Sequence, residues 1–230
     1  VVNQIPMISV GNQTICTGAS VTLVATAVPQ GAFYWGSGAA FGPSSLTFIP
    51  QQDTSIQVYN ILNGCSSDTV IATVNLLPLP ISNFDANYLE GCVPLSVTLS
   101  AQYTNYDNYN WFVDNQPIST GPQTTIDFTQ QGSFAVGLTT SQNGCTSTTV
   151  FPGFITTQDQ PIAAFESSLL YFTEETQLVQ FNNTSINASS YFWDFGAGEN
   201  TVIEDPSHQF TEVNNGREIT LIATSTLGCV

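Results

Sequence analysis

Apolar and polar residues alternate in short runs along most of the chain, with the two-residue period of a β-strand. Tyr191, Trp193 and Phe195 would share one face of such a strand, with Phe192 and Asp194 on the other. No segment keeps a 3.6-residue apolar period over three helical turns, and Ser, Thr, Asn and Gln fill most polar positions. These features predict an all-β protein.

The alternation recurs around three tryptophans, Trp35, Trp111 and Trp193. The first two follow Cys16 and Cys92 at the same spacing of 19 residues. The tripeptides that begin 14 residues before each tryptophan are Val21-Thr22-Leu23, Val97-Thr98-Leu99 and Val179-Gln180-Phe181. The pairs that close each repeat are Gly64-Cys65, Gly144-Cys145 and Gly228-Cys229. We interpret these regularities as three homologous units, each with a buried tryptophan in its core.

Short strands spaced by about 8–12 residues, with a tryptophan on the third strand, are typical of an immunoglobulin-like sandwich. We therefore predict three tandem immunoglobulin-like β-sandwiches in an extended array, as domains at residues 1–79, 80–158 and 159–230. Short linkers stiffened by proline, at 78–80 and 159–161, separate them.

The third unit ends one residue after Cys229, whereas the first continues from Thr69 to Leu76 as its last strand. We expect the third sandwich to lack this strand and to expose a sheet edge. A longer parent protein would supply the strand, and the alternative is a strand donated by another subunit. Val1–Val10 lacks the features of a signal peptide, so we expect the chain to be either a mature piece or a fragment cut from something longer.

Charge excludes several kinds of partner. The chain has 17 acidic residues but only one Lys or Arg, Arg217, and one histidine, His208, for a net charge of −16. Nucleic-acid binding needs many cations, so no nucleic acid is expected as a partner. Anionic membrane surfaces are disfavoured for the same reason, and no apolar run of about 18 residues predicts membrane insertion.

Residues that could support catalysis or metal binding are few. The lone His208 cannot form a histidine-rich metal site and is predicted to have a structural role. Glu174-Glu175 and Glu204-Asp205 are acidic pairs on predicted loops, and a weak Ca²⁺ site there competes with the simpler interpretation of solvated carboxylates. We favour the simpler one and expect no enzyme activity, no catalytic residues and no cofactor.

Three tyrosines could contact sugars. Tyr103, Tyr106 and Tyr109 would suit stacking on sugar rings if they shared an open face. Tyr109 alternates with Trp111 and is therefore predicted to lie in the core, which leaves two candidates.

The third unit resembles the PKD domain, whose pattern runs W-D-F-G-D-G and then N-P-S-H-x-Y. The matching residues are Trp193, Asp194, Phe195, Gly196, Gly198, Pro206 and His208. Ala197 replaces the second Asp of the pattern, which argues against metal binding in that turn. Residues 91–99 are similar to the G-C-A-P-L-x-V-x-F stretch of PKD domains in secreted Bacteroidota proteins, and residues 1–79 look like the PKD-like or immunoglobulin-like repeats of the same proteins.

This resemblance implies an extracellular place on the bacterial cell surface, as in gliding-motility adhesins exported by type IX secretion. It also implies a non-catalytic structural or adhesive role, as a semi-rigid acidic spacer or a fibre-forming rod. The implied partners are neighbouring domains of a longer chain, other copies of the protein or a surface polysaccharide. The alternatives are an accessory carbohydrate-contacting module of a secreted polysaccharide-degrading enzyme and a self-assembling filament subunit. Asp68-Thr69-Val70 resembles an O-glycosylation signal of such proteins.

Five cysteines in an oxidising compartment should be mostly paired, and two patterns compete. Bonds within each unit would join Cys16 to Cys65 and Cys92 to Cys145, leaving Cys229 alone. In an immunoglobulin-like order, however, those partners lie at opposite ends of a sandwich, roughly 20–25 Å apart, whereas a disulfide tolerates about 7 Å between Cα atoms. Bonds between units would join Cys16 to Cys145 and Cys92 to Cys229, with Cys65 bonded to a domain upstream. We favour the second pattern.

Overall fold

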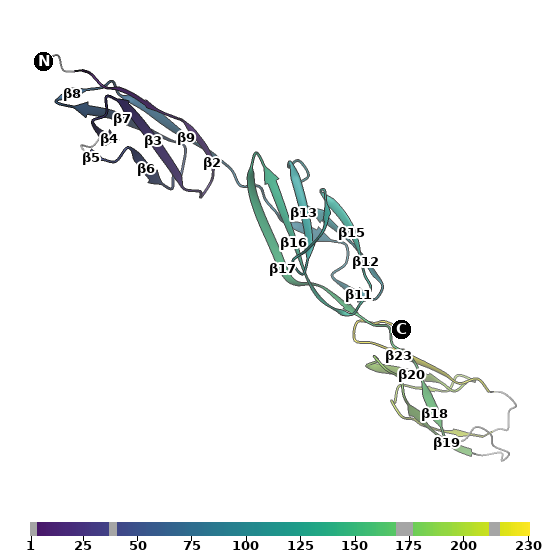
Figure 1. The fold of residues 1–230 in the computed structure, drawn as a ribbon. Coiled ribbons are helices and arrows are strands. Elements are labelled where there is room, and N and C mark those ends of the chain that lie inside the picture. The colour runs from purple at the N-terminus through teal and green to yellow at the C-terminus, as the bar shows by residue number, and fades with distance from the viewer. Residues whose placement is uncertain (1–3, 37–40, 169–176, 212–216) are drawn as a thin grey trace. The chain divides into compact units, whose positions relative to one another are not determined.

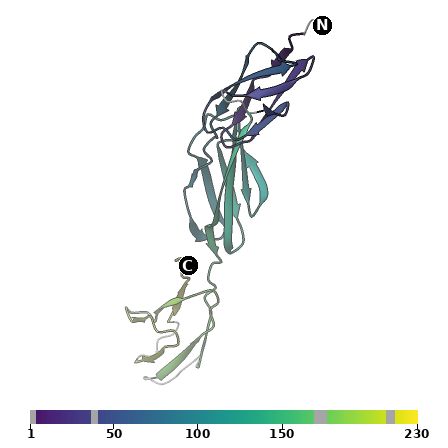
Figure 2. The same ribbon diagram turned by 90° about the vertical axis from the view of Figure 1, so that its left-hand side faces the viewer.

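A computed structural model describes residues 4–36, 41–168, 177–211 and 217–230 (Figure 1; Figure 2 shows the same ribbon turned by 90°). In these ranges the chain forms β-strands and no helix, which confirms the prediction of an all-β protein. It follows that no helix in the described ranges could cross a membrane. The strands build six sheets, which fall along the sequence in three successive pairs of the immunoglobulin-like kind. We call these pairs the first (β1–β9), second (β10–β17) and third (β18–β23) sandwich.

The first sandwich places a three-stranded sheet, β1-β3-β6, over a sheet ordered β2-β9-β7-β4-β5, in which β8 also pairs with β7. Its strands are β1 (Met7–Val10), β2 (Gln13–Cys16), β3 (Val21–Val28), β4 (Ala32–Trp35), β5 (Phe41–Gly42), β6 (Ser45–Phe48), β7 (Thr54–Leu62), β8 (Cys65–Ser66) and β9 (Val70–Leu77). Alternate residues of both sheets meet in one core, where Val21 and Leu23 pack with Trp35, Val58 and Val74. The pairing of β2 with β9 is parallel, and the other pairings are antiparallel.

The second sandwich has the same plan, with sheets β10-β12-β15 and β11-β17-β16-β13-β14. Its strands are β10 (Phe84–Ala86), β11 (Glu90–Cys92), β12 (Leu95–Ala101), β13 (Asn108–Val113), β14 (Gln116–Thr120), β15 (Gln123–Phe128), β16 (Gly132–Gln142) and β17 (Cys145–Gln158). Phe84 contacts the buried Trp111 edge to face, with ring centroids 5.2 Å apart. The short β11 runs parallel to the end of β17, as β2 does to the end of β9.

The third sandwich pairs sheets β18-β19-β22 and β21-β20-β23. Its strands are β18 (Phe165–Ser167), β19 (Gln177–Asn183), β20 (Ser190–Asp194), β21 (Asn200–Thr201), β22 (Ser207–Phe210) and β23 (Thr220–Thr224). Val179 and Phe181 pack with Trp193, Phe195 and Phe210. In the described residues β23 is an edge strand, whereas β7 and β16 are each followed in their sheets by another strand, β9 and β17.

Tight turns place three of the cysteines. Asn63-Gly64 and Asn143-Gly144 have φ angles of 48° and 83°, and of 51° and 81°. Positive φ at both central residues is the geometry of a type I′ hairpin, for which Asn-Gly is a preferred sequence. Gly228, with φ of 80°, directly precedes Cys229, and its N–H donates to the carbonyl of Ser225 at 3.1 Å. Each turn therefore presents a cysteine as its next residue.

The chain separates into two compact units. The first contains the described part of residues 1–82 together with 103–109 and 139–148, and the second contains the described part of 83–102, 110–138 and 149–230. Two segments of the second sandwich, which include the start of β13, the end of β16 and the start of β17, thus belong to the same unit as the first sandwich. The domain limits after residues 79 and 158, and the extended arrangement, remain predictions.

Candidate functional site

The structure contains two disulfides, and both join successive sandwiches. Cys16, the last residue of β2, bonds to Cys145, the first residue of β17, with a Cα–Cα distance of 5.6 Å. Cys92, the last residue of β11, bonds to Cys229 in the turn after β23, also with Cα atoms 5.6 Å apart. These are the two bonds of the pattern in which disulfides join different units. Cys65 has no disulfide in the part of the chain that the structure describes.

Strand order explains why Cys16 and Cys65 do not meet. Cys16 lies opposite Leu77, at the end of β9, whereas Cys65 precedes the start of β9 at Val70. The eight residues of β9 separate the two cysteines by roughly 25 Å along the strand. A disulfide needs Cα atoms within about 7 Å, so each cysteine can bond only to a residue beyond its own sandwich.

Hydrogen bonds surround the second bridge. Cys92 lies opposite Gln158, the last residue of β17. The Oε1 atom of Gln158 accepts hydrogen bonds from Thr226 Oγ1 at 3.0 Å and from the backbone N–H of Leu227 at 3.2 Å. The turn that carries Cys229 is therefore also held by the end of the strand beside Cys92. No charged group takes part in these contacts.

The first bridge has comparable polar support. Both the backbone N–H and the hydroxyl of Thr17 donate to the carbonyl oxygen of Leu77, at 2.9 and 3.0 Å. Further along, the N–H of Ile81 donates to the hydroxyl of Tyr106 at 3.0 Å. These bonds anchor the end of β9 and the segment after it, within the unit that contains both Cys16 and Cys145.

The predicted sugar-stacking tyrosines do not share an open face. Tyr109 is 5% exposed, and its hydroxyl accepts a hydrogen bond from the N–H of Tyr106 at 2.8 Å. The ring of Tyr106 lies between the other two, with centroids 6.1 Å from Tyr103 and 6.2 Å from Tyr109. Of the three side chains only Tyr103 is exposed.

The PKD-like motif builds a turn between β20 and β21. Asp194 Oδ1 accepts a hydrogen bond from the N–H of Gly196 at 2.8 Å, and the N–H of Phe195 donates to the carbonyl of Glu199 at 2.9 Å. The φ angles of Gly196, Ala197 and Gly198 are all positive. Asp194 therefore stabilises the backbone of the turn. Pro206, from the second half of the motif, is buried, and its carbonyl accepts the N–H of Phe181 at 2.9 Å.

His208 lies within β22, which begins at Ser207. Its ring stacks on Phe195, with centroids 4.2 Å apart and planes 9° from parallel. Its Nε2 atom lies 3.0 Å from Glu199 Oε2, although the direction of approach is not that of a hydrogen bond. Arg217 Nη1 is 3.6 Å from the same carboxylate oxygen.

The two basic side chains of the protein thus converge on one acidic residue, Glu199, which the sequence did not single out. The composition gave one signal, because two basic side chains among 17 carboxylates can each lie beside only a few of them. The pattern of residues could not show which one. Because Glu199 is half-exposed, its contacts with these two side chains lie at the surface and contribute little to stability.

Of the two acidic pairs, Glu204-Asp205 lies in the described ranges, and it belongs to no group of three side chains that could hold a metal ion. Asp205 Oδ1 accepts a hydrogen bond from the N–H of Asn183 at 2.8 Å, so it fixes a strand end. Glu174-Glu175 lies outside the described residues. Elsewhere in those ranges, no three His, Cys, Asp or Glu side chains gather in a way that could hold a metal ion.

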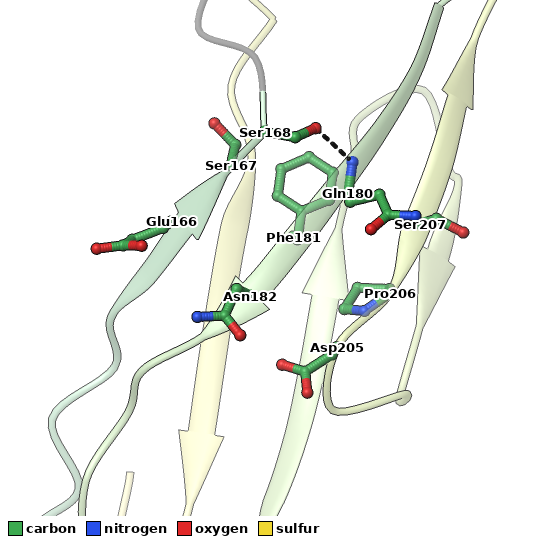
Figure 3. A pocket seen from close by; sticks show the side chains of 9 residues that line it. All are labelled: Glu166, Ser167, Ser168, Gln180, Phe181, Asn182, Asp205, Pro206 and Ser207. Carbon is green, nitrogen blue, oxygen red and sulfur yellow. Dashed lines mark hydrogen bonds between the residues drawn. The ribbon is translucent and has the colours of Figure 1, made fainter.

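A hollow of about 420 Å³ lies on the third sandwich beside β18, β19 and β22 (Figure 3). Its lining residues are Glu166, Ser167, Ser168, Gln180, Phe181, Asn182, Asp205, Pro206 and Ser207. Ser168 Oγ accepts a hydrogen bond from the N–H of Gln180 at 3.0 Å, and Figure 3 shows Glu166 pointing away from Asp205. The lining offers hydroxyl, amide and carboxylate groups but no His, Cys, Lys or Arg.

No protein-family model matches the chain, and no curated protein matches its sequence. Among solved structures it is similar to Sidekick-1 immunoglobulin domains 1–5, with 14% identity, a TM-score of 0.35, and coverage of 99% of this chain and 57% of that one. It is also similar to the N-terminal eight Ig domains of DSCAM, with 13% identity, a TM-score of 0.49, and coverage of 85% of this chain and 29% of that one. For the titin I-band fragment I67–I69 the identity is 8%, the TM-score is 0.47, and the coverage is 97% of this chain and 94% of that one.

The chain therefore spans 57% of the Sidekick-1 structure and 29% of the DSCAM structure. Since all three TM-scores are below 0.5, the immunoglobulin-like character of the fold rests on the strand order of the protein itself.

Proposed function

We propose that the chain is a non-catalytic structural section of an extracellular bacterial surface protein, and that its disulfides limit how far it can extend under load. The observation that carries this proposal is the overlap of the two covalent loops. Residues 92–145 lie inside both the loop closed by Cys16–Cys145 and the loop closed by Cys92–Cys229.

Overlap shortens the covalent path through the protein. A force applied at residues 1 and 230 passes through residues 1–16, crosses the first bridge, returns from 145 to 92, and crosses the second bridge to 229. At about 3.5 Å per residue, this path is roughly 250 Å long, against roughly 800 Å for the open chain. The bridges would therefore hold the section short even if all three sandwiches unfolded.

Disulfides persist in oxidising compartments, which supports an extracellular location. The resemblance of residues 193–208 to the PKD motif supports the bacterial cell surface, with neighbouring domains of a longer protein as the partners. A sequence with one Lys or Arg also offers a single site to trypsin-like proteases, which suits exposure outside the cell. Surface carboxylates favour solubility.

Single-molecule stretching tests the proposal directly. The protein is held at its two termini, in a Cys65→Ser background that removes the free thiol. We expect a final contour length of roughly 250 Å without reductant and roughly 800 Å with dithiothreitol.

Variants with one bridge are matched controls. Removing Cys16 and Cys145 leaves a path of roughly 330 Å, and removing Cys92 and Cys229 leaves one of roughly 360 Å, because each variant keeps a different short cut. A contour length near 800 Å in the absence of reductant would overturn the proposal.

A further inference from the structure

The free thiol of Cys65 occupies the same position as two cysteines that are bonded. Cys65 and Cys145 each follow an Asn-Gly turn with positive φ at both residues, and Cys229 follows a different turn that ends in Gly228, whose φ is also positive. In the second and third sandwiches this turn cysteine bonds to a cysteine at the end of a short strand, β2 or β11. Only the turn of the first sandwich lacks such a bond among the described residues.

Cys65 is open to a partner. Its side chain is partly exposed, and it starts β8, which pairs with the end of β7 through Leu62. The partner of Cys145 approaches from outside the second sandwich, as does the partner of Cys229 from outside the third. By the same geometry, the partner of Cys65 would approach the end of the first sandwich where β8 lies, and β2, which ends at Cys16, points to the other end (Figure 1).

Exposed apolar side chains mark this same end. Gly31 donates its N–H to Asn60 Oδ1 at 2.9 Å, which places the β3–β4 loop beside the end of β7. Three residues before Gly31, Val28 is 75% exposed and lies opposite Met7, which is 80% exposed. Apolar surface at an open end is what a neighbouring sandwich would cover.

Resting on the function proposed above, we infer that Cys65 is a third bridge site, which bonds to the strand-end cysteine of another sandwich of this kind. The strand-end cysteines of this chain, Cys16 and Cys92, are already bonded. The partner is therefore a sandwich outside these 230 residues that carries a cysteine where β2 and β11 do. Its source is either the same polypeptide or a second protein.

The bond forms by two thiol–disulfide exchanges. The Cys65 thiolate attacks a small-molecule or enzyme disulfide, forms a mixed disulfide and releases one thiol. The partner thiolate then attacks the Cys65 sulfur of that mixed disulfide and releases the second thiol. Two protein thiols are oxidised, and one external disulfide is reduced to two thiols.

Peptide mapping of the protein isolated from its source tests the inference. Thiols are blocked with iodoacetamide at harvest, and the unreduced protein is digested with pepsin at low pH, because the sequence has a single tryptic site. We expect the Cys65 peptide to be joined to a cysteine peptide from outside residues 1–230. Electrophoresis with and without reductant then assigns the partner to the same polypeptide or to a second one.

Recovery of Cys65 mainly as the blocked thiol would overturn the inference, as would a bond between Cys65 residues of two copies. A Cys65→Ser variant made in the same source is the control, and its partner cysteine should be recovered blocked. The same digest reports Cys16–Cys145 and Cys92–Cys229. If these two bonds are present and Cys65 is free, the inference fails while the proposed function stands. If they are absent, the proposed function fails.

Discussion

Each sandwich buries one tryptophan, but the three indole groups differ in their hydrogen bonds. Trp35 Nε1 donates to the carbonyl of Pro43 at 2.9 Å, and Trp111 Nε1 donates to the carbonyl of Gly121 at 2.8 Å. Trp193 Nε1 is buried and has no acceptor among the described residues. An unpaired buried donor lowers stability, so the third core gains less from its indole than the second core does.

This difference predicts unequal effects of the same substitution. Trp111→Phe removes ring volume and also leaves the Gly121 carbonyl without its donor, whereas Trp193→Phe removes ring volume and an unpaired N–H. We expect Trp111→Phe to cost about 1–2 kcal/mol more than Trp193→Phe.

Hydrogen exchange of peptides from each sandwich measures the two local losses separately, which is needed because several sandwiches can unfold independently. Peptides from the unmutated sandwiches are the internal control. Equal losses at the two sites would contradict the prediction.

At the scale of strands, the ends of β9 and β17 each pair with a second strand and lead out of their sandwich. Each pairs in parallel with the short strand that carries a cysteine, and each continues into the segment that leads to the next sandwich. In β17 this end is Gln158, whose side-chain oxygen accepts from Thr226 and Leu227. The turn that holds Cys229 is therefore fixed by hydrogen bonds as well as by the disulfide.

Gln158→Leu should free this turn without breaking the disulfide. The substitution keeps the size of the side chain but removes the acceptor, so exchange of the Leu227 amide should become roughly tenfold faster. Gln158→Glu retains an acceptor oxygen and should keep Leu227 protected. Residue-resolved hydrogen exchange by NMR measures both variants. Unchanged protection of Leu227 in Gln158→Leu would show that the disulfide alone orders the turn.

For the whole molecule, the covalent connections are not those of a simple linear chain. The loops closed by the two disulfides overlap along the sequence, since Cys92 lies between Cys16 and Cys145, and Cys145 lies between Cys92 and Cys229. Reduction therefore changes the covalent connectivity of the entire protein.

Trypsin offers a direct check of the second loop. Arg217 is the single Lys or Arg, so trypsin acting on the protein in urea should cut once, before Glu218. Because Cys229 is bonded to Cys92, residues 218–230 should stay attached until reductant is added. Mass spectrometry with and without reductant measures their release. A variant lacking Cys92 should release the same peptide without reductant, and release from the unaltered protein without reductant would contradict the pairing.

Local patterns in the sequence were enough to determine the elements. Alternating apolar residues identified strands and the faces they bury, as around Trp111 and Trp193, because a strand exposes its side chains with a fixed two-residue period. The Gly-Cys pairs marked the end of each unit, and the structure adds that the Asn-Gly pairs before two of them form turns, because few residues other than Gly and Asn tolerate positive φ. Spacing from cysteine to tryptophan gave the repeat, since equivalent strands have equivalent lengths.

Contacts between distant residues were decided only by the tertiary structure. Sequence reasoning left two disulfide patterns open, and the strand order resolves them by placing Cys16 and Cys65 at opposite ends of β9. The choice of Glu199 as the common partner of His208 and Arg217 likewise depends on how the β20–β21 turn lies beside β22. Such pairings follow from how strands are arranged in space, and a periodic pattern of residues carries no information about that arrangement.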